Sequence, residues 1–137
     1  MEALGAKAMP FDFKTECCGA SFSISDTDVV LQLSGKILEM AKESGAHAIV
    51  VACPLCQSNL DMRQPDIEKK FKVRYDLPIF YLTQLMAMAF GYPKDKMMFS
   101  KHIVPVDGAL AHIGEVIEEP KKTAKGKKAV KAESEVE

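Results

Sequence analysis

The stretch His47-Ala48-Ile49-Val50-Val51-Ala52-Cys53-Pro54-Leu55-Cys56 decides the fold. Its first six residues form a short apolar run, which predicts a β-strand that is buried on both faces. Cys53-Pro54 marks the next junction, because proline fits the first turn of a helix, where a backbone N–H has no partner in any case. We therefore expect a strand that leads into a helix, with Cys53 at the N-cap and Cys56 at the third helical position.

An amphipathic helix is predicted before this strand. Ser25 and Asp28 form a predicted capping box at its start, and Gly45 is a stop signal at its end. The loop before it, residues 14–25, contains the first pair of cysteines, and residues 8–13 alternate like a short strand. The apolar residues that recur at helical spacing are Val29, Val30, Leu33, Ile37, Leu38 and Ala41.

Strands and helices alternate along the rest of the chain as well. The expected elements are a helix from Pro54 to about Gln64, a polar stretch over 64–75, a strand over 77–80, a helix over 82–90 and one or two short helices over 94–119. This order predicts an α/β fold, with a small, mainly parallel sheet flanked by helices in a Rossmann-like three-layer arrangement. Residues 1–119 form the predicted domain.

Residues 120–137 form a predicted disordered tail, because lysine, alanine and glutamate offer little apolar surface to bury. The whole chain of 137 residues has a net charge of −1, although six of its 18 basic residues lie in this tail. The remaining body is mildly acidic, so we expect no nucleic acid as a partner. The longest apolar stretch, residues 77–92, is shorter than the roughly 20 residues of a bilayer span. We therefore expect a cytoplasmic protein without membrane insertion.

All four cysteines lie in two tight pairs, Cys17-Cys18 and Cys53-Pro54-Leu55-Cys56, with 34 residues between the pairs. Thiols at a helix N-terminus face free N–H groups and the positive end of the helix dipole, which stabilises thiolates. Taken alone, Cys-x-x-Cys is compatible with a redox dithiol, half a zinc site or iron–sulfur ligation.

The first pair narrows this choice. Adjacent residues on an extended strand point to opposite faces, so Cys17 and Cys18 converge only through a bend, which Gly19 permits. A single zinc ion usually takes cysteines spaced by two to four residues, whereas a multi-iron cluster offers separate irons to neighbouring sulfurs. This pair therefore favours a cluster. A structural zinc-binding assembly domain and a metal-free dithiol oxidoreductase that uses Cys53 and Cys56 are the alternatives.

Two motifs carry a resemblance to a known family. Glu16-Cys17-Cys18-Gly19-Ala20 and Val51-Ala52-Cys53-Pro54-Leu55-Cys56-Gln57 resemble the cysteine-rich CCG domain of the family of heterodisulfide reductase B-type subunits. The likeness extends over residues 2–92 and includes Leu77-Pro78-Ile79-Phe80-Tyr81-Leu82-Thr83-Gln84-Leu85. In the family, a further cysteine lies well upstream of the Cys-Cys-Gly motif.

The resemblance implies an iron–sulfur oxidoreductase that holds a non-cubane [4Fe–4S] cluster. Cys17, Cys18, Cys53 and Cys56 match four cluster ligands, and no catalytic residue beyond the cluster is implied. The implied substrate is the disulfide CoM-S-S-CoB or a related disulfide. The implied partners are an N-terminal CCG domain of the same polypeptide, a C-like iron–sulfur subunit and an A-like flavoprotein subunit. The family's upstream cysteine has no counterpart here, so the chain is either the C-terminal part of a two-domain subunit, which we expect, or a protein that has lost this ligand.

Overall fold

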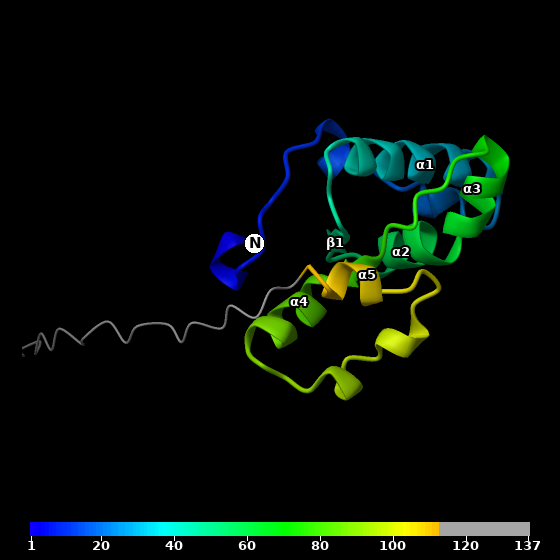
Figure 1. The fold of residues 1–137 in the computed structure, drawn as a ribbon. Helices are drawn as coiled ribbons and strands as arrows, with labels where there is room; N and C mark the ends of the chain where they lie inside the picture. Colours follow the sequence, from blue (N-terminus) through cyan, green and yellow to red (C-terminus); the bar gives the residue numbers. More distant parts are fainter. Residues whose placement is uncertain (113–137) are drawn as a thin grey trace, which may run out of the picture.

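Two short parallel strands, β1 (Ile49–Val51) and β2 (Ile79–Tyr81), form the centre of the computed structural model, which describes residues 1–112. The register pairs Ile49 with Ile79 and Val51 with Tyr81. Helices flank the strands on both sides (Figure 1). The helices in chain order are α1 (Thr27–Glu43), α2 (Pro54–Gln57), a π-helical turn (Ser58–Met62), α3 (Gln64–Phe71), α4 (Leu82–Ala89) and α5 (Asp107–Leu110).

The helices divide into two layers because successive residues of a strand point to opposite faces. On one face, Ile49 and Ile79 are buried in a core cluster that includes Leu38 of α1 and Ile67 of α3. On the other face, Phe80 packs in a second cluster with residues of α4 and α5. Figure 1 shows β1 between α1 on one side and α4 and α5 on the other. The predicted parallel α/β fold is confirmed.

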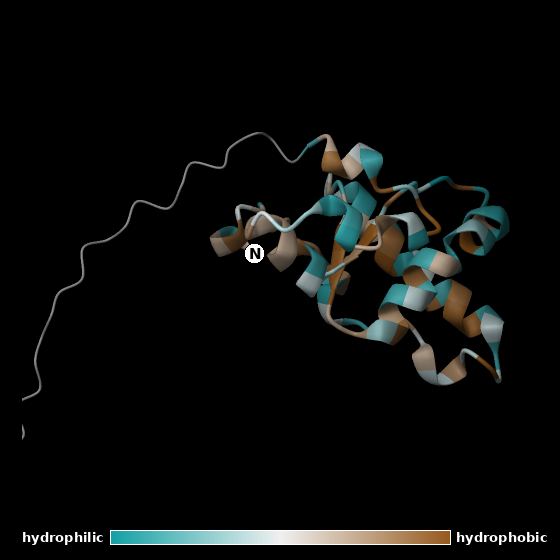
Figure 2. Ribbon diagram, turned by 90° about the horizontal axis from the view of Figure 1, so that it is seen from below, coloured by the Kyte–Doolittle hydropathy of each residue, from teal (hydrophilic) through white to brown (hydrophobic). Residues whose placement is uncertain are grey.

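Helix α1 is the longest helix of the described residues. Its buried face includes Val30, Ile37 and Leu38. Figure 2 shows hydrophobic and hydrophilic residues interspersed along the helices. The start of α1 differs from the prediction. Asp26 is the N-cap and accepts a hydrogen bond from the N–H of Val29 at 3.3 Å, so Ser25 is not the cap. Asp28 does not complete a capping box but forms an ion pair with Lys70 of α3. The helix ends before Gly45, as predicted, and Gly45 has a φ of 76°.

Three other predicted elements are also different. Residues 8–13 form no strand, and Asp12–Thr15 is a 3₁₀ turn from which Phe13 packs against the core. The helix expected from Pro54 to Gln64 changes to a π-helical turn at Ser58. Part of the polar stretch over 64–75 is α3, because the buried Ile67 anchors a narrow apolar stripe on an otherwise charged helix.

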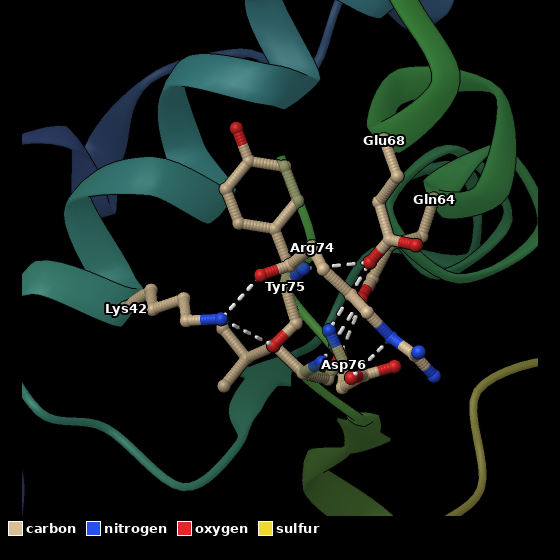
Figure 3. A network of polar contacts seen from close by, with 7 residues as sticks. Lys42, Gln64, Glu68, Arg74, Tyr75 and Asp76 are labelled. Atoms are coloured by element: carbon tan, nitrogen blue, oxygen red, sulfur yellow. Dashed lines mark hydrogen bonds and ion pairs between the residues drawn. The ribbon is translucent and has the colours of Figure 1, made fainter. Parts of the chain in front are cut away.

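The segment that leads into β2 is held by side chains from α1 and α3 (Figure 3). Gln64 is buried, and its amide both accepts from the N–H of Leu77 at 2.9 Å and donates to the carbonyl of Leu77 at 3.0 Å. Glu68 accepts from the N–H of Tyr75 at 2.7 Å, and Lys42 donates to the Tyr75 carbonyl at 3.2 Å. These bonds hold the start of β2 in place beside β1.

The remaining predictions concern the ends of the chain. The amino end is a 3₁₀ turn (Glu2–Leu4) followed by Gly5 at a φ of 78°. Residues 94–112 contain the short helix α5 and two 3₁₀ turns, Lys94–Lys96 and Phe99–Lys101. The predicted domain end at residue 119 and the predicted tail over 120–137 lie outside the described residues.

Candidate metal centre at the start of helix α2

The Cys-x-x-Cys pair lies where β1 gives way to α2. Cys53 is the N-cap with extended backbone angles (φ −86°, ψ 127°), and Pro54 occupies the first helical turn, as the sequence predicts. Cys56 is therefore the third helical residue. The pair lies beyond the carboxyl end of a parallel strand, which is where open α/β sheets bind ligands.

The backbone around Cys53 favours its thiolate. Cys53 is exposed. The N–H groups of Cys56 and Leu55 face its sulfur and lower the pKa of the Cys53 thiol, although neither contact reaches full hydrogen-bond geometry. Free N–H groups at a helix N-terminus have this effect on any anion placed there.

The environment of Cys56, in contrast, disfavours its thiolate. Burial raises the pKa of its thiol to about 12, and proximity to Cys18 and then to Cys53 contributes to the rise, because three thiolates so close together repel one another. Cys56 therefore lies close to both Cys18, from the first pair, and Cys53, from its own pair. Without a metal, the Cys56 thiol stays protonated at neutral pH.

Cys18 belongs to the protein core. It is 0% exposed, and its sulfur accepts a hydrogen bond from Nδ2 of Asn59 at 3.5 Å. Its carbonyl accepts from the hydroxyl of Ser34 on α1 at 3.1 Å. Gly19 follows with a φ of 83°, and a Cβ at this position would lie 3.0 Å from Cδ1 of Leu33. The bend predicted at Gly19 is confirmed, and it also lets the chain pass close to α1.

Cys17 is exposed, in contrast to the adjacent Cys18. All four cysteines are free thiols. The structure thus brings three of the four predicted site residues together and leaves Cys17 at the surface beside them. In residues 1–112, no three histidine, cysteine, aspartate or glutamate side chains are arranged to hold a single metal ion.

A polar clamp that sequence reasoning missed joins the two cysteine segments. Asn59 is buried in the π-helical turn, and its Oδ1 accepts from the Ser23 hydroxyl and from Nε of Arg63, each at 3.3 Å. Nη2 of Arg63 also donates to the Ser23 carbonyl at 2.9 Å. The signal in the sequence was an asparagine three residues after Cys56 with an arginine one turn further on. π-Helical turns are frequent at functional sites.

The two cysteine segments also contain exposed apolar side chains. Phe22 and Ile24 flank the clamped Ser23, Leu55 lies between Cys53 and Cys56, and Met62 is in the π-helical turn. Ile24 is 100% exposed.

The histidines do not join the cysteines as ligands. His47 and His112 stack on each other with ring centroids 3.7 Å apart, next to the amino end of β1, whereas Cys53 follows the carboxyl end. His102 contacts Gln84. None of the helices in residues 1–112 is both long and apolar enough to cross a bilayer.

The chain is similar to proteins of known kinds. The family of CCG cysteine-rich domains matches residues 1–61. The 8-methylmenaquinol:fumarate reductase membrane anchor subunit of Wolinella succinogenes is 32% identical over 104 residues, which are 76% of this chain and 37% of that protein. The B-type subunit of the ferredoxin:CoB-CoM heterodisulfide reductase of Methanosarcina mazei is 30% identical over 118 residues, which are 85% of this chain and 39% of that protein.

A protein of Archaeoglobus profundus that is itself like the heterodisulfide reductase B-type subunits is 32% identical over 98 residues, 70% of this chain and 33% of that protein. This chain therefore spans between 33% and 39% of the length of the three relatives. The matched region includes both cysteine pairs, since residues 1–61 contain Cys17, Cys18, Cys53 and Cys56. The chain carries the cysteine-rich CCG domain in residues 1–61 and is a homologue of the heterodisulfide reductase B-type subunits.

Proposed function

We propose that this chain is the cluster-binding domain of a B-type subunit like those of heterodisulfide reductases, and that it takes part in electron transfer and disulfide reduction. The proposed ligands of its non-cubane [4Fe–4S] cluster are Cys17, Cys18, Cys53 and Cys56. The observation that carries the proposal is the convergence of Cys18, Cys53 and Cys56, which come from two segments of the chain. The related subunits support membership of an oxidoreductase family.

The donor set fits an iron–sulfur cluster. The candidate ligands are all thiols, which are the ligands that hold such clusters. The described residues offer no arrangement for one metal ion, yet Cys56 has two thiol neighbours. A cluster spreads its ligands over several irons and therefore does not need them around a single point. When bound, it supplies one-electron reduction and an iron that can accept a sulfur atom.

The chain's own residues tune the charge of the sulfurs. The N–H groups of Leu55 and Cys56 stabilise negative charge on Cys53, and Nδ2 of Asn59 donates to the sulfur of Cys18. Hydrogen bonds to cluster sulfurs favour the more negative, reduced state and so raise the reduction potential. Cys17, which is exposed, completes the four-thiolate set in this proposal.

The substrate and partners are also part of the proposal, since the chain spans less than two fifths of its relatives. We propose a disulfide substrate, CoM-S-S-CoB or a related one. The proposed partners are a second, N-terminal CCG domain, a C-like iron–sulfur subunit and an A-like flavoprotein subunit.

The test is anaerobic reconstitution of the purified chain with iron and sulfide, beside the Cys53→Ser/Cys56→Ser double variant. We expect a brown, paramagnetic wild-type protein that contains iron and sulfide in similar amounts, and a colourless variant. A wild-type protein that takes up one zinc ion per chain and then resists iron would instead support the structural zinc-binding domain. Equal iron in both proteins would remove this pair from the ligand set.

A metal-free dithiol oxidoreductase is a second candidate, favoured by one observation. The exposed Cys53 has a lowered pKa and lies next to Cys56, as in helix-capping redox dithiols. This candidate needs only the second pair. It predicts that the metal-free wild-type chain reduces a disulfide when it is supplied with a dithiol reductant, and that Cys18→Ser does so equally well.

A further inference from the structure

In residues 1–112, side chains rather than a third strand cover the outer edge of β2. Because the N–H of Ile49 bonds to the carbonyl of Pro78, the alternate residues Ile79 and Tyr81 direct their backbone groups away from β1. Nε2 of Gln57 donates to the Ile79 carbonyl at 2.9 Å, and the Tyr81 N–H donates to Oε1 of Gln84 at 2.9 Å. Gln57 and Gln84 therefore lie beside each other on this edge.

The contacts of Gln84 determine which nitrogen of His102 carries the proton. Since Oε1 of Gln84 accepts from Tyr81, its Nε2 is the atom that donates to the Met97 carbonyl at 2.9 Å. The same Nε2 lies 3.0 Å from Nε2 of His102. An amide nitrogen only donates, so Nε2 of His102 has to accept. This arrangement places the ring proton of His102 on Nδ1.

Two polar atoms in this region have no partner among the described residues. They are Nδ1 of His102, which is a donor by the argument above, and Oε1 of Gln57, which is an acceptor. Both atoms are buried, and a buried polar atom without a partner is costly. Asp61, one turn after Gln57, accepts from the N–H groups of Ile103 at 2.9 Å and Val104 at 3.1 Å, directly after His102. The donor and the acceptor are thus held in the same region of the fold.

We infer that one water molecule bridges Nδ1–H of His102 and Oε1 of Gln57, and that His102 is through this water a positioning residue for the Cys-x-x-Cys segment. A water can serve here because it accepts one hydrogen bond while it donates another. Gln57 directly follows Cys56, so a bond that holds its side chain also holds the end of α2 that carries Cys56. The inference concerns the metal-free chain and does not depend on which metal group the cysteines bind.

The tautomer and the water are tested directly by NMR of the ¹⁵N-labelled, reduced, metal-free chain. We expect the His102 ring proton on Nδ1, in slow exchange with solvent and with a cross-peak to a bound water. A proton on Nε2, or a cross-peak to no water, would overturn the inference whatever metal the cysteines later bind.

The positioning role is tested by the alkylation rate of Cys56 in the same chain, resolved from Cys53 by mass spectrometry. His102→Gln keeps an acceptor for Gln84 but removes the donor to the water, whereas His102→Asn keeps an amide donor near the position of Nδ1. We expect about tenfold faster alkylation of Cys56 in His102→Gln. His102→Asn should be closer to the wild type.

His47→Gln is the matched control, because His47 lies next to the amino end of β1 and stacks on His112. It should leave the alkylation of Cys56 unchanged. Alkylation that is the same in His102→Gln and the wild type, or faster in His102→Asn than in His102→Gln, would contradict the positioning role. If a variant does not fold, the NMR measurement on the wild type still decides the tautomer and the water.

Discussion

The two cysteine pairs are built in different ways. Cys53 and Cys56 are placed by local helix chemistry, with a proline in the first turn and backbone N–H groups that face the exposed sulfur. Cys17 and Cys18 are placed by distant parts of the chain. Ser34 bonds to the carbonyl of Cys18, and Asn59 bonds to its sulfur. The comparison teaches that a short motif can form one half of a site alone, whereas the other half depends on the packed fold.

Gly19→Ala, next to the first pair, should cause the largest loss of stability. At a φ of 83°, a Cβ would lie 3.0 Å from Cδ1 of Leu33 and 3.3 Å from Cα of Val30, so α1 would have to shift to accommodate it. We expect a loss of about 2–4 kcal/mol in the free energy of unfolding, measured by urea denaturation. Gly45→Ala is the matched control, since Gly45 also has a positive φ but no atom within 4 Å of its Cβ position.

Gly45→Ala should therefore lose only the backbone contribution, about 1 kcal/mol. Equal losses in the two variants would show that the close approach of Gly19 to α1 adds nothing to stability. The first cysteine pair would then depend on its own turn alone, as the second pair does.

Asn59→Ala should have the next largest effect. It removes the amide that contacts the sulfur of Cys18 and accepts from Ser23 and Arg63. We expect a loss of about 1–3 kcal/mol in the free energy of unfolding and faster alkylation of the buried Cys18 in the metal-free chain. Ser23→Ala, which removes one partly buried hydroxyl from the same clamp, should lose less than about 1 kcal/mol. A larger loss in Ser23→Ala than in Asn59→Ala would place the centre of the clamp elsewhere.

Within the second pair, the two thiols should differ in reactivity. The pKa of Cys53 is lowered by the N–H groups of Cys56 and Leu55, and the pKa of Cys56 is raised to about 12 mainly by burial. At pH 7 the metal-free chain should therefore be alkylated at Cys53 at least about tenfold faster than at Cys56. The ratio should fall as the pH rises toward 10, because the thiolate fraction of Cys56 grows while that of Cys53 saturates. Equal rates at pH 7 would contradict the assigned environments.

The sequence predicted best what local rules determine. The N-cap position of Cys53, the third helical position of Cys56, the helix stop at Gly45 and the bend at Gly19 are all confirmed. The parallel pairing followed from the alternation of strands and helices. Val50 and Val51 were expected to be buried on both faces, but they are only half-buried. Among residues 1–112 the sheet has two strands, which leaves their sides partly open.

The rest of the site depends on tertiary contacts that no short pattern encodes. Asp26 is the cap of α1 in place of Ser25, because only the packed geometry decides which of two neighbouring oxygens reaches the N–H of Val29. In the sequence alone, nothing distinguishes Asn59 and Arg63 from other polar residues of a helix. Their role depends on the loop after Gly19, which the fold brings against them. The exposure of Cys17 beside the buried Cys18 likewise has no sequence signal.

The central claim is that both cysteine pairs hold one iron–sulfur cluster. The most direct test is the iron and acid-labile sulfide content of Cys18→Ser beside the wild type after anaerobic reconstitution, since Cys18 is the member of the first pair that reaches Cys56. We expect iron and sulfide in similar amounts in the wild type and near-complete loss of both in the variant. Equal iron and sulfide in the two proteins would contradict a cluster shared by both pairs.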